Sequence, residues 1–270
     1  MRANCQQLQR GKVMTEQIVN ISIENKVGIV EINKPPHNFF DIDLISTLAD
    51  VYEEFENNPQ VRAIVLCANG KSFCAGADFS KKEVMNKKRS IKEVNPLYQE
   101  AIRLFSCTKP IVAAIEGSAI GGGLGLALTA DFRVSCPEAK FSANFNRLGF
   151  HPGFALSYTL PKLIGLQKSA WMFYTGVRLN GTKALDLGLI DFLVEQNEVR
   201  NQALALANEI AISSPRAVQA TRKSLLGDRL SEIRLAVVRE SEVQAVQMTS
   251  QDIKEGVTAS AERRDPVFID

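Results

Sequence analysis

Short runs of β-branched and other apolar residues alternate with a helical segment in the first half of the chain. Each run is bounded by turn residues, which is the pattern of a strand. The runs span residues 28–35, 61–69 and 109–117. Between the first two, residues 41–59 carry apolar side chains at helical spacing, with Asp41 or Asp43 as the N-cap and Pro59 near the end. Strands that alternate with helices predict an α/β fold.

The pattern changes along the chain. Residues 121–132 begin as a helix after a cluster of glycines, and 132–143 predict two short strands across a turn. From residue 160 onward the apolar positions recur only at helical spacing. The expected helices there cover 160–176, 198–215, 216–228 and 230–264. The pattern therefore predicts an α/β core followed by a helical region.

Composition and charge exclude several kinds of protein. Of the 270 residues 45% are hydrophobic and 23% are charged, with a formal net charge of +2, as in ordinary globular proteins. A dedicated nucleic-acid binder usually carries a strong basic excess, so we expect no nucleic-acid partner. Two histidines and five scattered cysteines without a Cys-x-x-Cys pair predict no metal site.

Two segments bear on membranes and targeting. The N-terminus has no apolar core of the kind a secretory signal needs, and unpaired cysteines suit a reducing compartment, so we expect a cytoplasmic protein. Residues 110–130 are long and apolar enough to raise a membrane span. Glu116 and the glycines inside that segment favour a buried strand, a turn and a buried helix instead, without a membrane partner.

Five glycines fall within residues 117–125, where the apolar strand meets the next helix. Neither the dinucleotide pattern Gly-x-Gly-x-x-Gly nor the P-loop ending Gly-Lys-Ser/Thr is present. Two interpretations stay open. The glycines allow a helix and a strand to pack closely, or they leave backbone N–H groups bare for an anion. A second loop, 72–79, reads SFCAGADF, and N–H groups from two loops can converge on one oxygen as an oxyanion hole.

At this point the chain resembles the crotonase superfamily, the enoyl-CoA hydratases and isomerases. The similar segments, in the order of the family, are GIVEINKPPHN (28–38), KSFCAGADF (71–79), AAIEGSAIGGGLGLALTADFRV (113–134), AKFSANFNRLGFHPGFALSYTLPKLIG (139–165), GVRLNGTKALDLGLIDFLV (176–194) and EGVTASAERRDPVF (255–268). Together they cover about residues 16–270. Several spaced motifs that agree make the resemblance specific.

The resemblance implies a fold, a substrate and an assembly. It implies a flexible tail over 1–15, a crotonase-type core of repeated ββα units in a spiral over 16–205, and a helical oligomerisation region over 206–270. The substrate would be an acyl-CoA thioester, with coenzyme A as part of the substrate and no separate cofactor. The chain would assemble as a homotrimer or a dimer of trimers.

Site residues are carried over from the matching motifs. The oxyanion-hole N–H groups would belong to Ala77 and Gly122, and the backbone near Ala75 would meet the adenine of coenzyme A. Asp78 and Gly121 flank the oxyanion residues and would lie against the substrate. In the C-terminal segment, Arg263 keeps a basic position that the family uses for coenzyme A.

The chain departs from the family at the two glutamates that handle water and protons in hydratases. Their positions are Gly125 and Phe145, and neither side chain transfers a proton. His151 is expected in the loop lining the acyl pocket and could serve as acid or base, or could be a wall or capping residue. Asn144 could orient a water, or only bond at the end of a strand.

Three functions stay open on this reading. The first is the family reaction, hydration or isomerisation of an enoyl-CoA, with His151 or a bound water in place of the glutamates. The second is another reaction through an enolate, such as decarboxylation or hydrolysis of an acyl thioester, because decarboxylation needs no initial base. The third is binding of acyl-CoA without catalysis.

Overall fold

The computed structural model describes residues 17–79 and 94–269 and contains two sheets. The larger sheet has the order β1-β2-β3-β5-β7-β10 and the smaller one β4-β6-β8-β9. The larger sheet comprises β1 (Val19–Glu24), β2 (Val27–Ile32), β3 (Ala63–Ala68), β5 (Ile111–Ile115), β7 (Phe132–Ser135) and β10 (Phe192–Leu193). The smaller sheet comprises β4 (Ser72–Cys74), β6 (Ser118–Ile120), β8 (Lys140–Ser142) and β9 (Leu179–Asn180). The expected tail over 1–15 lies outside the described residues.

The repeat of the fold is a strand in each sheet followed by a helix. β3, β5 and β7 pair in parallel in the larger sheet, and β4, β6 and β8 follow them one by one in the smaller sheet, also in parallel. All six residues of β3 and all five of β5 are buried, as expected for parallel strands covered on both faces. This is the α/β crotonase-type fold that the sequence predicts, and the C-terminal helices follow it.

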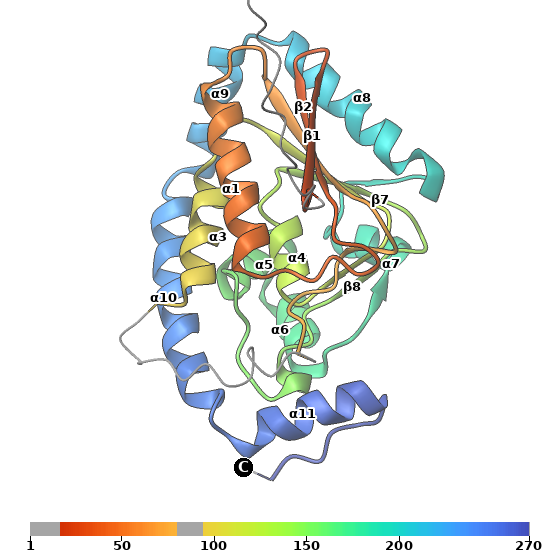
Figure 1. Cartoon of the computed structure of the whole chain (residues 1–270), viewed down its shortest axis with the longest axis vertical. Coiled ribbons are helices and arrows are strands. Elements are labelled where there is room, and N and C mark those ends of the chain that lie inside the picture. The colour runs from red at the N-terminus through yellow and green to blue at the C-terminus, as the bar shows by residue number, and fades with distance from the viewer. Residues whose placement is uncertain (1–16, 80–93, 270) are drawn as a thin grey trace, which may run out of the picture.

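The helices have the following bounds: α1 (Ile42–Asn57), α3 (Pro96–Ser106), α4 (Gly122–Ala127), η1 (Asn146–Leu148), α5 (Leu156–Ile164), α6 (Leu166–Thr175), α7 (Gly181–Leu187), η2 (Gln196–Glu198), α8 (Val199–Ile212), α9 (Pro215–Leu226), α10 (Arg229–Gln247) and α11 (Gln251–Glu262). Figure 1 shows α1, α3 and α10 along one flank, α8 across the sheet on the other side, and α11 at the lower end. No helix in the described part of the chain has both the length and the apolarity of a membrane span.

Three sequence expectations need correction. The region after residue 160 also contains the short strands β9 and β10. The continuous helix expected over 230–264 is two helices, because Ser250 begins α11 as an N-cap whose side chain accepts a hydrogen bond from Ile253 N. The two strands of 132–143 lie in different sheets.

The boundary expected between 205 and 206 falls inside α8, which packs on β3, β5 and β7, so the division of the chain into core and C-terminal region stays a prediction.

Candidate active site

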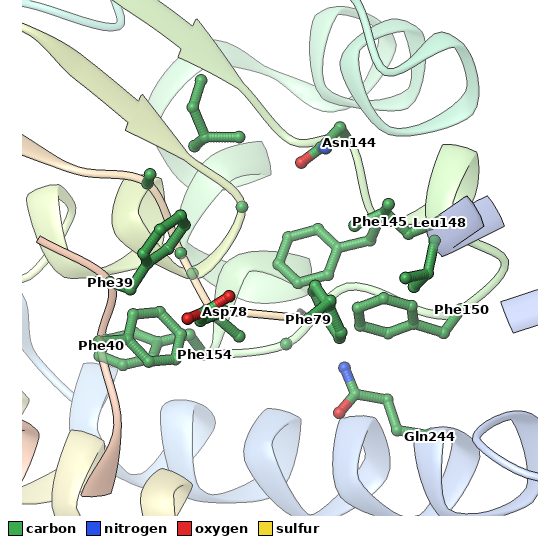
Figure 2. A pocket seen from close by; sticks show the side chains of 18 of the residues that line it. Phe39, Phe40, Asp78, Phe79, Asn144, Phe145, Leu148, Phe150, Phe154 and Gln244 are labelled. Carbon is green, nitrogen blue, oxygen red and sulfur yellow. The ribbon is translucent and has the colours of Figure 1, made fainter. Parts of the chain in front are cut away.

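A cavity of about 980 Å³ opens beside the smaller sheet. Its wall comes from the loops after β4 and β6, from segment 144–154, from α3, and from α10 and α11. Figure 2 shows phenylalanine side chains on two sides of it, with Asn144 above and Gln244, on α10, below. Residues far apart in the sequence therefore line one space. Of the sequence-predicted site residues, the cavity brings together Ala75, Ala77, Asp78, Gly121, Gly122, Asn144 and Phe145.

Two backbone N–H groups at the cavity, those of Ala77 and Gly122, are candidates to bind a ligand. Phe40 forms an isolated parallel bridge with Ala77, and Phe40 N donates to Gly76 O at 3.0 Å. In such a bridge the opposite residue directs its own N–H to the other side, so Ala77 N–H is directed away from Phe40. Gly122 is the first residue of α4, where N–H groups lack intrahelical partners. Among the residues that the structure describes, neither N–H has a backbone acceptor.

The loops that carry these N–H groups touch. A Cβ added at Gly76 would lie 2.8 Å from Ile120 O and 3.7 Å from Gly122 N. β4 and β6, which lead into the two loops, are parallel neighbours. Two N–H donors that come this close at a cavity wall can hold one oxygen atom, and helix α4 adds the positive end of its dipole.

The glycine cluster serves packing as well as the cavity. A Cβ at Gly123 would stand 1.9 Å from Cys74 O, and one at Gly117 would stand 2.3 Å from Lys71 O. Gly121 has a φ of +56°, in the region that favours glycine. A Cβ at Gly122 would meet the ring of Phe40 at 2.2 Å. Close packing therefore explains these glycines, and the binding of an anion at the same loop stays a prediction.

Phenylalanine side chains surround Gly125 and Phe145, the two positions at which the sequence resemblance predicts missing glutamates. A Cβ at Gly125 would lie between 2.8 and 3.0 Å from three atoms of the fully buried Phe154, and Gly125 is absent from the cavity wall. Phe145 lines the cavity, and its ring meets that of Phe150 edge to face with centroids 5.5 Å apart. Phe154 packs beside Gly125, outside the described wall, and the expected contact of Gly125 with the substrate stays a prediction.

His151 lies in a loop whose residues Phe150 and Gly153 line this cavity, but it is itself absent from the wall, and its role as acid or base stays a prediction. Its Nδ1 lies 2.7 Å from Pro152 O, and its backbone N donates to Gln247 Oε1 at 2.7 Å. Arg263 is also absent from the wall, because it forms the left-handed C-cap of α11 with a φ of +57°. The cationic side chains on the wall belong instead to Arg178 and Lys254.

Polar side chains at the cavity are mostly uncharged hydroxyl and amide groups. Asp78 is the only aspartate or glutamate among the described residues of the wall. Tyr98 OH donates to Gln244 Oε1 at 2.7 Å, and Gln244 Nε2 donates to His151 O at 2.7 Å. The amide of Gln244 therefore ties α3 and segment 144–154 to α10.

Helix α10 carries a second anchor that sequence reasoning missed. The carboxylate of Glu240 accepts hydrogen bonds from Ala155 N at 2.8 Å, Ser157 N at 2.9 Å and Ser157 Oγ at 2.6 Å. Ala155 has a positive φ and begins α5, so a side chain from another helix caps that N-terminus. Burial raises the pKa of Glu240 to about 7, against the effect of these hydrogen bonds. A weak signal existed in the sequence, because the polar positions 240, 244 and 247 share one face of the helix with the apolar positions 233, 236 and 237.

The comparisons with known proteins agree with this architecture. The family model described as enoyl-CoA hydratase/isomerase matches residues 22–270. The chain belongs to the enoyl-CoA hydratase/isomerase family. It is an acyl-CoA enzyme of that family.

Individual members of the enoyl-CoA hydratase/isomerase family match over most of their length. The short-chain-enoyl-CoA hydratase of Clostridium acetobutylicum is 32% identical over 246 residues, covering 89% of this chain and 93% of that protein. The human mitochondrial enoyl-CoA hydratase domain-containing protein 2 is 34% identical over 256 residues, covering 90% and 86%. A crystal structure of an enoyl-CoA hydratase/isomerase from Pseudoalteromonas atlantica has a TM-score of 0.84 at 30% identity, covering 94% of this chain and all of that one.

Proposed function

We propose that the protein binds an acyl-CoA thioester and holds its carbonyl oxygen between the N–H groups of Ala77 and Gly122 while an enolate forms. The observation that carries this is the pair of N–H groups on two touching loops of the cavity wall, neither with a backbone acceptor among the described residues. Donors fixed in advance at a developing oxyanion are worth about 3–4 kcal/mol each, because they need no reorganisation during the reaction.

The residues that line the cavity suggest the remaining contacts with the substrate. Gly121, Asn144 and Phe145 lie beside the thioester and its acyl group, and Ala75 lies at the coenzyme A side, where its N–H is already bonded to His37 O at 3.0 Å. The wall cations Arg178 and Lys254 suit the phosphates better than Arg263, which lies off the wall. We propose a homotrimer or dimer of trimers through residues 206–270, as the family resemblance implies.

The family reaction needs a group that carries a proton, and in this site we assign that role to a group other than the two glutamates of the family. Hydration adds the hydroxyl of a water to Cβ of the enoyl group and a proton to Cα, and isomerisation moves a proton between carbons. We propose that the chain lacks both family glutamates, with Gly125 and Phe145 in their place. Asp78, which follows the oxyanion donor Ala77, is then the carboxylate available on the wall. In hydration or isomerisation, Asp78 or a bound water gives the substrate its proton or takes one from it.

A second candidate is favoured by the packing around Gly125. Phe154 fills the space next to Gly125, which leaves no room there for a general base. Decarboxylation of a 2-carboxyacyl-CoA needs none: the bond between Cα and the carboxylate breaks, CO₂ leaves, and the electron pair stays as the enolate at the oxyanion hole. Water then protonates Cα of the enolate.

The proposal is tested with acetoacetyl-CoA, whose enolate has its own absorption band. We expect the protein to increase this band at a pH below the ligand's pKa, and excess butyryl-CoA to remove the increase. Binding measured by calorimetry without any change in the band would overturn the oxyanion assignment. Crotonyl-CoA, followed by loss of its enoyl absorbance, and methylmalonyl-CoA, followed by CO₂ release, then separate the two candidate reactions.

A further inference from the structure

The cavity is lined by phenylalanine rings in two groups. The first group lies at the oxyanion loops: Phe40 pairs through its backbone with Ala77, and its ring contacts that of Phe154 with centroids 5.7 Å apart. Phe154 is fully buried, with the ring of Phe105 behind it at 6.3 Å. The rings of the first group are thereby fixed in position by their neighbours.

The second group comprises Phe79, Phe145 and Phe150 and stands on the other side of the cavity, as Figure 2 shows. Phe150 is the centre of this group. Its ring meets Phe145 at an interplanar angle of 84° and Phe79 at 62°, in both cases edge to face. The tip of Phe145 reaches the oxyanion loop, because a Cβ at Gly121 would lie 3.8 Å from Phe145 Cζ.

The two groups leave a space between them that begins at the proposed carbonyl site. An aliphatic chain in that space gains binding free energy only from the burial of its apolar surface. An aromatic ring gains the same burial, and it also extends the edge-to-face contacts that Phe150 already makes with its neighbours. Near that space the amide of Gln244 is already bonded to Tyr98 OH and His151 O, so it does not demand a polar substituent on the ligand.

We infer that the acyl group of the substrate carries an aromatic ring, held between Phe40, which Phe154 supports from behind, on one side and Phe79, Phe145 and Phe150 on the other. This inference rests on the proposed function, because it assumes that the thioester carbonyl lies at Ala77 and Gly122. A four-carbon enoyl group would bind with its carbonyl in the same place and leave the space between the rings unfilled.

Three CoA esters of nine-carbon acids test the inference by calorimetry: 3-phenylpropanoyl-CoA, 3-cyclohexylpropanoyl-CoA and nonanoyl-CoA. The first two have a six-membered ring at the same place, and only the first is aromatic. We expect 3-phenylpropanoyl-CoA to bind roughly tenfold more tightly than the cyclohexyl ester. Equal or tighter binding of the cyclohexyl or nonanoyl ester would overturn the inference and leave a merely apolar pocket.

Single substitutions identify which phenylalanine side chains cause the preference for the phenyl ester. Phe150→Leu removes the central ring and should abolish the preference for the phenyl ester. Phe79→Leu should reduce it and keeps the inference testable if the first variant does not fold, since Phe79 is only half-buried. Phe192→Leu, on β10 and 37% exposed outside the cavity, is the matched control and should keep the preference. An unchanged preference in Phe79→Leu and Phe150→Leu would contradict the placement of the ring.

Failure of this inference and failure of the proposed function give different results. If the proposed function is wrong, the acetoacetyl-CoA enolate band does not change. If only the inference is wrong, the band increases and the three nine-carbon esters bind without preference for the phenyl ring.

Discussion

At the scale of single residues, the proposed function depends on Asp78 and Gly125. Asp78 places a carboxylate on the cavity wall, next to the proposed oxyanion donor Ala77. Gly125 has no side chain, and Phe154 packs against it. On this proposal any proton carried by a side-chain carboxylate passes through Asp78.

The role of Asp78 is tested by Asp78→Asn, which keeps the shape and removes the proton carrier. If the reaction is hydration or isomerisation, we expect its rate to fall on the order of 10²–10⁴-fold, and the acetoacetyl-CoA enolate band to change by less than about twofold. Steady-state rates with each substrate measure this, with the exposed Asp43→Asn on α1 as the control. A rate of hydration that survives the change would show that water alone carries the proton.

Gly125→Ala tests the contact with Phe154. The added Cβ would stand 2.8 Å from Phe154 Cβ, which cannot move aside like the end of a flexible chain. Overpacking costs about 1–3 kcal/mol, and the better helix propensity of alanine returns about 1 kcal/mol. We therefore expect the free energy of unfolding to fall by up to about 2 kcal/mol in urea titrations. A gain in stability would mean that Phe154 can leave this place.

Helix α10 is the element that organises the site from a distance. Glu240 holds the N-terminus of α5, Gln244 holds Tyr98 and His151 O, and Gln247 holds His151 N. Ser241 Oγ accepts from Asn95 N at 2.8 Å, at the start of α3. One face of a single helix therefore fixes two of the segments that carry cavity side chains, α3 and segment 144–154.

The stability of this element should depend on pH through Glu240. Its pKa is raised from 4.5 to about 7, so the folded state binds the proton more tightly than the unfolded state. The contribution of this group to the free energy of unfolding is therefore greatest below pH 4.5 and falls as pH rises toward 7, by on the order of 3 kcal/mol.

Urea unfolding at several pH values, compared with Glu240→Gln, measures this contribution, because all other titrating groups are common to both proteins. We expect the wild type to lose stability relative to the variant as pH rises from 4.5 to 7. A constant difference across that range would show that the carboxyl does not titrate there.

At the scale of the whole molecule, the cavity is closed by the C-terminal helix. α11 contributes Lys254, Val257 and Ser260 to the wall. It packs on η1 through two close approaches: a Cβ at Gly149 would lie 2.5 Å from Asp252 C, and one at Gly256 would lie 2.5 Å from Leu148 C. Residues more than 100 positions apart along the chain thus complete one site.

Gly149→Ala tests this packing, with Gly188→Ala as its matched control. Both glycines have a positive φ, +83° and +77°, but nothing lies within 4 Å of a Cβ at Gly188. Backbone strain should cost each variant about 1 kcal/mol or more. Only Gly149→Ala should also displace α11 and weaken the binding of butyryl-CoA, measured by calorimetry. Equal affinities in the two variants would mean that α11 is not needed for binding.

Much of the fold was predictable because its signals are local. The helix at 41–59 was expected with Asp41 or Asp43 as its cap, and Asp41 caps it by accepting from Leu44 N at 3.0 Å. The strands β2, β3 and β5 were predictable because each is a run of β-branched residues with turn residues at both ends. β9 and β10 were missed because two-residue strands have no periodicity and exist only through their partners β8 and β7.

The sequence by itself determined the alternation of strands and helices, the family, and the two glycine-bearing loops at which the site forms, because these depend on side-chain spacing over about ten residues. Only the tertiary structure decided which side chains meet at the cavity. It excluded His151 and Arg263 from the wall, and it brought Tyr98 to Gln244 across 146 residues of chain. Such contacts depend on how separate elements pack, and no local pattern specifies that.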